Sequence, residues 1–155
     1  MIKEIITISD YPDLLAAKAL DLSVADILSS SIQTLIEDMK DTCHAAEGLG
    51  LAATQIGAGA NLCVYKEPGA VGYKVLINPY IKGHKEPFKS KAEGCLSVPG
   101  RRFNVTRYKK ITVEGLDEHG NKVEFTTKSK KLAVILQHEI DHLNGITIAD
   151  KGKEI

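Results

Sequence analysis

The 155-residue chain contains no tryptophan, and aromatic residues make up only 5% of it. Neither sign of charge dominates, because 20 Lys and Arg residues balance 20 Asp and Glu residues. This balance argues against a protein that binds nucleic acid through a strongly basic field, and against an acidic solvating tail. The longest strictly aliphatic run, Leu132–Leu136, is far too short to cross a membrane.

Cysteine is also scarce. Cys43, Cys63 and Cys95 cannot all pair, and Met1–Ile6 lacks the basic and apolar segments of a secretory signal. We therefore expect reduced thiols and a cytoplasmic protein. The 43% of hydrophobic residues suffices for one core, and no repeat or linker divides the chain. A single domain over residues 1–155 is expected.

Helical periodicity marks two segments. After a short helical stretch at Leu14–Leu20, a long helix is expected from the capping pair Ser23 and Asp26 to Gly48, with apolar residues at helical spacing on one face. A second helix is expected over Ser129–Leu143, because Asn144-Gly145 is a typical helix end.

Segments rich in β-forming residues lie between the two helices. They are Leu62–Tyr65, Lys74–Ile81, Ile111–Leu116 and Val123–Thr127. The last two flank Asp117–Asn121, which is a good hairpin turn. Ile146 and Ile148 alternate and suggest a final short strand or edge contact. We expect an α+β fold, with antiparallel strands packed around a central C-terminal helix and with a long N-terminal helix.

The second helix contains a pattern typical of metal hydrolases. His138 and His142 stand four residues apart, so their imidazoles lie on one helix face, and Glu139 is close enough to reach a water held there. The apolar segment Lys131–Leu136 indicates a buried helix, where imidazoles need partners. The alternative is a polar helix end with two surface histidines.

A catalytic metal site needs a third protein ligand and an open position. Little chain follows His142, whereas Cys95 stands upstream between a glycine and a strand-like segment. A Cys95 thiolate would complete a Cys-His-His set. Without the helix motif, a small buried hydrophobe is an equally good interpretation of Cys95, and it is the one we adopt for Cys43 and Cys63.

The third feature is the glycine-rich segment Gly48–Gln55. Its G-x-G-x-x-A spacing fits a dinucleotide fingerprint, but the glycines follow a helix rather than a strand. Small residues here would instead let a ligand approach the backbone closely. Gln55 offers an uncharged amide donor to an oxyanion.

Together the three segments resemble the peptide deformylase family. Its motifs G-x-G-L-A-A-x-Q, E-G-C-L-S and H-E-x-D-H stand complete and in order at Gly48–Gln55, Glu93–Ser97 and His138–His142. The likeness extends over nearly the whole chain, including Asn78-Pro79 and Arg107. The resemblance implies a metal-dependent hydrolase that removes the formyl group from the N-terminal methionine of new polypeptides and releases formate.

The resemblance also implies roles for residues. Cys95, His138 and His142 would bind one divalent metal, natively Fe2+, with Ni2+, Co2+ or Zn2+ able to substitute. Glu139 would take a proton from water and return it to the departing amine. The metal, the Gln55 amide and the backbone N–H of Leu96 would hold the oxyanion.

The formylated peptide would lie as an added strand beside the segments Gly48–Gly50 and Gly94–Leu96, with its methionine in an apolar pocket. The residues expected to contact it are Leu49, Gly50, Gly94, Arg102, Val134 and Ile135. Among charged neighbours, Arg107 is expected to pair with Glu47 or Asp141. The implied partners are nascent N-formylmethionyl peptides at the ribosome, without direct binding of nucleic acid or membrane, and a monomer is expected.

Two departures from the family pattern stand out. The chain ends 13 residues after His142, without the long C-terminal helix of many bacterial members. This suits a short form, including a phage-encoded one acting in its host's cytoplasm. Lys131 stands where many relatives have an apolar residue near the methionine pocket.

Two other functions fit the metal motif. One is a different small metal-dependent amidase or peptidase. The other is a zinc-stabilised binding module without enzymatic activity, although such structural sites are typically closed by four protein ligands.

Overall fold

The computed structural model describes residues 1–155 and confirms the α+β class with an antiparallel sheet. The helices are α1 (Pro12–Leu15), α2 (Val24–Ile27), α3 (Ser30–Ala45), the 3-10 helix η1 (Ala53–Ile56), α4 (Lys130–Leu143) and α5 (Ile148–Lys151). The strands are β1 (Gly50–Ala52), β2 (Leu62–Tyr65), β3 (Lys74–Cys95), β4 (Val98–Leu116), β5 (Lys122–Thr126) and β6 (Lys153–Glu154). The sheet order is β1-β2-β3-β4-β5, and β6 pairs with β4.

The first three strands separate two hydrophobic clusters. Leu51, Val64 and Val75 are paired across β1, β2 and β3, and they pack with buried residues of α3. Their chain neighbours Ala52 and Cys63 point to the other face and pack with α4. Helices therefore cover both faces of this part of the sheet. Side chains alternate between the two faces of a strand, so residues on both faces are apolar, and the sequence shows nearly continuous apolar runs.

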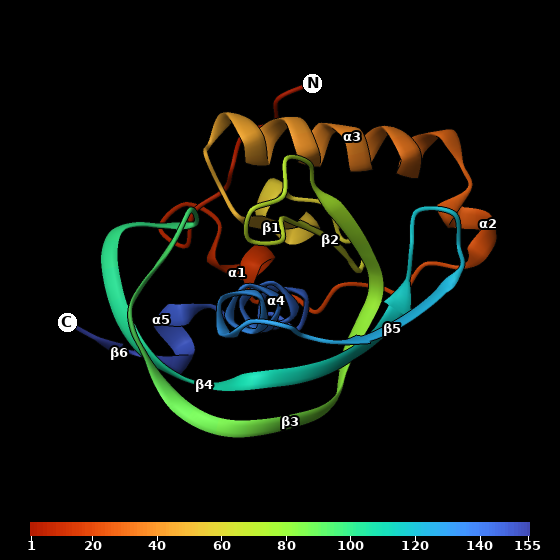
Figure 1. Ribbon diagram of the computed structural model, residues 1–155. Coiled ribbons are helices and arrows are strands. Elements are labelled where there is room, and N and C mark those ends of the chain that lie inside the picture. The colour runs from red at the N-terminus through yellow and green to blue at the C-terminus, as the bar shows by residue number, and fades with distance from the viewer.

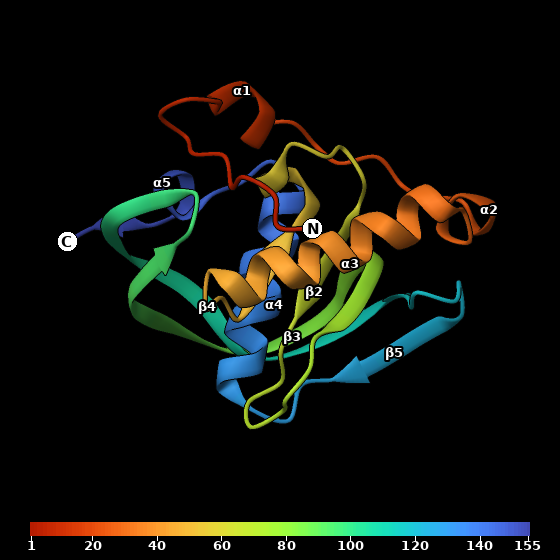
Figure 2. The same cartoon turned by 90° about the horizontal axis from the view of Figure 1, so that it is seen from above.

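The helix α4 lies inside the molecule, enclosed by the sheet. Figure 1 shows it nearly end-on, with α3 on the far side of β1 and β2 and with the β3–β4 hairpin curving beneath it. Seen from above in Figure 2, α3 crosses over the strands while α4 runs below them. Nine side chains of α4 are buried. Polar groups on this helix must therefore find their partners inside the protein.

The single helix expected between Ser23 and Gly48 is wrong, because the structure divides it into α2 and α3. Leu28 ends α2 and is exposed, and the Ser29 hydroxyl caps α3 by accepting from Ile32 N–H. The helix ends at Ala45, and Glu47 rather than Gly48 takes the left-handed conformation, with φ of 55°. The stretch Leu14–Leu20 is helical only at its start.

The expected strands exist, but two of them are much longer than predicted. The strand starting at Lys74 continues to Cys95, and the strand ending at Leu116 begins at Val98. Together they form a long hairpin with several register shifts. Glu86 and Ala92 have positive φ within β3, so the alternation of apolar and polar residues is lost there and the sequence pattern does not reveal a strand.

The C-terminal segment also differs from expectation. Ile148 begins the one-turn helix α5 instead of a strand, because Thr147 and Asp150 form a reciprocal capping pair. Gly145, with φ of 76°, is the left-handed stop of α4. None of the helices combines the length and apolar character that crossing a membrane requires.

We predict that Ile148 anchors this segment. Its side chain is 2% exposed and packs with Val98, Phe103 and Val105 of β4. Ile148→Ala is expected to lower the free energy of unfolding by about 2–5 kcal/mol, through lost burial and a cavity. Ile155→Ala, at a position that is 67% exposed, is the matched control and should stay within about 0.5 kcal/mol of the parent. Chemical denaturation measures both, and equal effects would contradict the anchoring role.

Candidate active site

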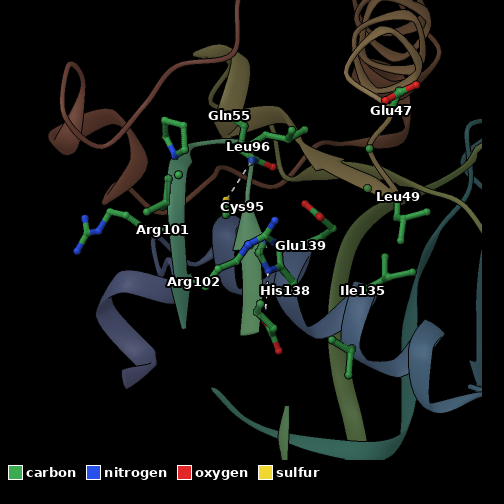
Figure 3. Close-up of a pocket in the computed structure, with 18 residues that line it drawn as sticks. Glu47, Leu49, Gln55, Cys95, Leu96, Arg101, Arg102, Ile135, His138 and Glu139 are labelled. Carbon is green, nitrogen blue, oxygen red and sulfur yellow. Dashed lines mark hydrogen bonds and ion pairs between the residues drawn. The ribbon is translucent and has the colours of Figure 1, made fainter. Parts of the chain in front are cut away.

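A cavity of about 590 Å³ opens between β1, the tip of the β3–β4 hairpin and α4. Figure 3 shows the side chains that line it. Eleven of the twelve residues proposed from the sequence line this cavity, namely Leu49, Gly50, Gln55, Gly94, Cys95, Leu96, Arg102, Val134, Ile135, His138 and Glu139. The twelfth, His142, is buried just behind the wall. Segments far apart in the chain therefore meet at one hollow.

Three metal-ligating side chains converge at the base of the cavity. The Nε2 atoms of His138 and His142 are 3.2 Å apart, and the Cys95 Sγ atom is 3.2 Å from His142 Nε2. All three ligand atoms lie within 4.8 Å of one another. One helical turn separates the two histidines, and the end of β3 supplies the cysteine, so this cluster requires the hairpin to dock on α4.

These residues fit a divalent metal. Two nitrogens held tetrahedrally at about 2.0–2.1 Å from Zn2+ lie about 3.3 Å apart, close to the spacing of the two imidazoles. Burial lowers the pKa of His142 well below its usual value, which keeps the ring neutral with a lone pair available. The Glu139 Oε2 atom is buried without a hydrogen-bond partner, as expected where a bound group completes the site.

Glu139 lies at the wall of the cavity against β1. A Cβ atom placed on Gly50 would stand only 2.7 Å from Glu139 Oε1, so the carboxylate occupies the space that a side chain there would fill. Burial raises the pKa of Glu139 to about 7, although the charges of His138 and Arg107 oppose the shift. A carboxyl group of this pKa can both accept and donate a proton near neutrality.

The amide of Gln55 has a defined orientation. Its Oε1 accepts a hydrogen bond from Ala52 N–H at 2.9 Å, which directs the NH2 group into the site. That NH2 group donates to Ser97 Oγ at 3.1 Å and lies 3.7 Å from Cys95 Sγ. Leu96 lines the cavity between Cys95 and Ser97, in the turn that joins β3 to β4.

A buried arginine connects the hairpin to α4. The guanidinium of Arg107, 1% exposed, donates to both carboxylate oxygens of Glu93 at 3.1 and 2.8 Å and to Asp141 at 2.6 Å. Glu93 in turn lies 3.6 Å from His138 Nδ1. Burial works against ionised Glu93, but the nearby His138 ring and the hydrogen bonds from Arg107 hold its pKa at about 2. Glu93 is thus an anion that orients the His138 ring.

The structure decides between the two partners expected for Arg107. Asp141 is a partner, whereas Glu47 is not and instead lines the cavity mouth. Glu93, the second partner, was not predicted, although its place two residues before Cys95 was a usable signal. Arg101 forms an exposed ion pair with Glu154. By contrast, the guanidinium of Arg102 lies directly over Gly94, beside the cavity.

The apolar side of the cavity is formed by Leu49, Val134 and Ile135. Leu49 precedes β1, and the other two belong to the first half of α4. Cys43 and Cys63 are fully buried in the two hydrophobic clusters, and they contribute nothing to the cavity. Their role as small hydrophobic residues is confirmed.

Comparisons with known proteins agree with this geometry. The sequence profile of the family described as Polypeptide deformylase matches residues 2–155. The chain is 41% identical to a peptide deformylase of Aquifex aeolicus (strain VF5), over 99% of this chain and 89% of that protein. Its structure is similar to a crystal structure of a peptide deformylase from Legionella pneumophila, with a TM-score of 0.88, 38% identity, and 97% and 86% coverage of the two chains.

A peptide deformylase from Synechococcus elongatus, solved in complex with actinonin, is similarly close, with a TM-score of 0.87, 32% identity, and coverage of 97% of this chain and 79% of that one. The profile match and these identities extend over almost all of the sequence, and the three motifs meet at one cavity. The chain therefore belongs to the peptide deformylase family.

Proposed function

We propose that the Cys95–Glu139 cavity is where this enzyme hydrolyses the formyl group from the N-terminal methionine of new polypeptides, yielding formate and a free α-amine. One observation carries the assignment to these residues. Three ligand atoms from β3 and α4 converge beside a buried carboxylate whose pKa lies near 7. A merely structural metal site would not need the carboxylate, and it would be closed by a fourth protein ligand.

Cys95, His138 and His142 are the proposed holders of the single divalent metal. When bound, the metal supplies Lewis acidity at the base of the cavity, for polarising a carbonyl group and for acidifying water. Thiolate and imidazole donors suit several divalent metals, and we infer Fe2+ as the native one from family membership. Glu93 keeps the His138 ring in place through Nδ1.

Glu139 is the proposed general base and acid. It takes a proton from the attacking water and then delivers a proton to the amine nitrogen as the C–N bond breaks. Its position against Gly50 limits the movement of the carboxylate, so the proton acceptor is held at one place. The carboxyl group is buried, which shields it from bulk water.

Gln55 and the Leu96 backbone N–H are the proposed donors to the oxyanion that forms at the former formyl carbonyl. The hydrogen bond from Ala52 holds the Gln55 amide ready for this role, so little reorganisation is needed. A neutral amide also leaves the charge of the site unchanged.

We propose that the peptide binds as an extra strand beside β1. This strand ends the sheet order, so its outer edge is free to pair with an extended chain. Backbone pairing with residues 48–50 on one side and 94–96 on the other ignores side-chain identity. The apolar wall of Leu49, Val134 and Ile135 receives methionine, and Arg102 contacts substrate carbonyls.

The ligand assignment predicts that replacing any one of the three ligands abolishes metal binding. Cys95→Ala, His138→Ala and His142→Ala should each lose bound metal and formate release, because only three protein ligands are present. Cys43→Ala, at a buried cysteine outside the cavity, is the matched control and should keep its metal. Elemental analysis of anaerobically purified protein measures occupancy, and iron is the expected metal. A fully loaded Cys95→Ala protein would remove Cys95 from the ligand set.

Replacing the base separates binding from chemistry. Glu139→Gln should keep the fold and the metal, yet release formate about 10²–10⁴-fold more slowly, because a carboxamide cannot carry the proton. The measurement is turnover of a formyl-Met peptide, with its unformylated counterpart as the peptidase control. Unchanged turnover would show that another group acts as the base, and cleavage of the unformylated peptide would favour a peptidase.

The contact between Gly50 and Glu139 predicts a steric effect. Gly50→Ala places a methyl group against the carboxylate, and a displacement of about 1 Å is expected to slow turnover about 100-fold. Gly59→Ala is the control, because a Cβ atom there meets nothing within 4 Å. Turnover is compared at equal metal content. Wild-type turnover by Gly50→Ala would mean that the position of Glu139 is not critical.

A further inference from the structure

A second cavity of about 260 Å³ adjoins the active-site cavity. The two hollows share Leu49 and Ile135, which form a thin partition between them and stand together at one side of the site in Figure 3. The other walls come from α4 and from the loop after β2, and they are Lys66, Glu67, Pro68, Gly69, Ala70 and Lys131. Since Leu49 is 43% exposed, the partition is itself open to solvent.

The charge balance of this second cavity is positive. Lys66 and Lys131 line it, and neither forms an ion pair with a carboxylate. The carboxylate that does line it, Glu67, is paired with Lys74 at 3.1 Å. Lys131 lies in the first turn of α4, where the helix dipole adds positive potential. The Lys66 ammonium lies over the Tyr73 ring, 6.0 Å from its centroid, and has no carboxylate partner. An anionic group placed in this cavity would therefore meet two lysines whose charge no carboxylate neutralises.

The proposed binding mode brings one substrate side chain to this place. In an extended strand, side chains alternate between the two faces, so the first and third residues point the same way, about 7 Å apart. In the proposed mode the peptide runs from the metal ligands past Gly50 toward Gly48, and Lys66 N–H, which donates to the Leu49 carbonyl, lies farther along in that direction. The third side chain would then project on the same face as methionine, beyond Leu49 and Ile135. The second side chain points away from it.

We propose that Lys66 and Lys131 form a subsite for an acidic side chain at the third residue of the formylated peptide. This inference rests on the proposed function, because it uses the same cavity and strand-like binding mode. The enzyme would then act on most new chains, as backbone recognition allows, but faster on those with Asp or Glu at the third position. Lys131, which stands where many relatives have an apolar residue, would then contribute to substrate specificity.

The test compares formate release from formyl-Met-Ala-Glu-Ser with that from formyl-Met-Ala-Gln-Ser, at low and high salt. Partly exposed ion pairs are individually weak, so the expected preference for Glu in kcat/KM is about fivefold. It should shrink at 1 M salt, where the Debye length is about 3 Å. Formyl-Met-Glu-Ala-Ser and formyl-Met-Gln-Ala-Ser serve as the control pair and should differ little.

The variants assign the effect to residues. In the Lys66→Gln/Lys131→Gln double variant, the Glu-to-Gln ratio at the third position should fall to about one. Lys130→Gln is the matched control, because Lys130 is the neighbouring lysine on α4 and does not line the cavity. A ratio near one in the parent enzyme, or a ratio that survives the double variant, would overturn the subsite. If the enzyme released formate from none of the peptides, the proposed function itself would be overturned.

Discussion

The active site depends on the ion pairs that the buried guanidinium of Arg107 forms with two carboxylates. It links Glu93, two residues before the cysteine ligand, to Asp141, the neighbour of His142. Removing one partner from such a network leaves a charge buried without compensation, which typically destabilises a protein by about 3–5 kcal/mol. The network therefore couples the docking of the hairpin on α4 to the geometry of the metal ligands, and the site cannot form before the hairpin is in place.

Much of the site was predictable because its chemistry is encoded locally. Two histidines four residues apart share a helix face in any α-helix, and Ser129 and Gly145 mark where α4 starts and stops. The α+β class followed from the order of helical and strand-like segments. The buried face of α3 was also predictable, since Met39 and Cys43, which lie at helical spacing, are both buried.

The rest depends on contacts between distant segments, which leave no periodic signal. The β3 side of the outer hairpin is mostly exposed and has shifted register, so neither alternation nor burial identifies it, although Phe103, Val105 and Arg107 alternate inward on β4. Glu93 belongs to a visible motif, but its bond to Arg107 depends on the pairing register of that hairpin. Position 50 requires glycine because the Glu139 carboxylate, 89 positions along the chain, fills the space of a side chain there. The sequence of α4 alone does not show which segment packs against Glu139.

The shortness of β1 has a consequence for how the enzyme handles its product. Only Gly50–Ala52 form this edge strand, so an extended peptide finds few backbone partners there. Two-stranded pairing of this length is marginal in water and needs additional contacts to persist. In the proposed binding mode a deformylated chain loses its contacts at the base of the cavity and keeps the methionine contacts and a backbone pairing that is short on the β1 side. A short edge thus favours rapid dissociation, and it also offers little template on which unrelated strands could aggregate.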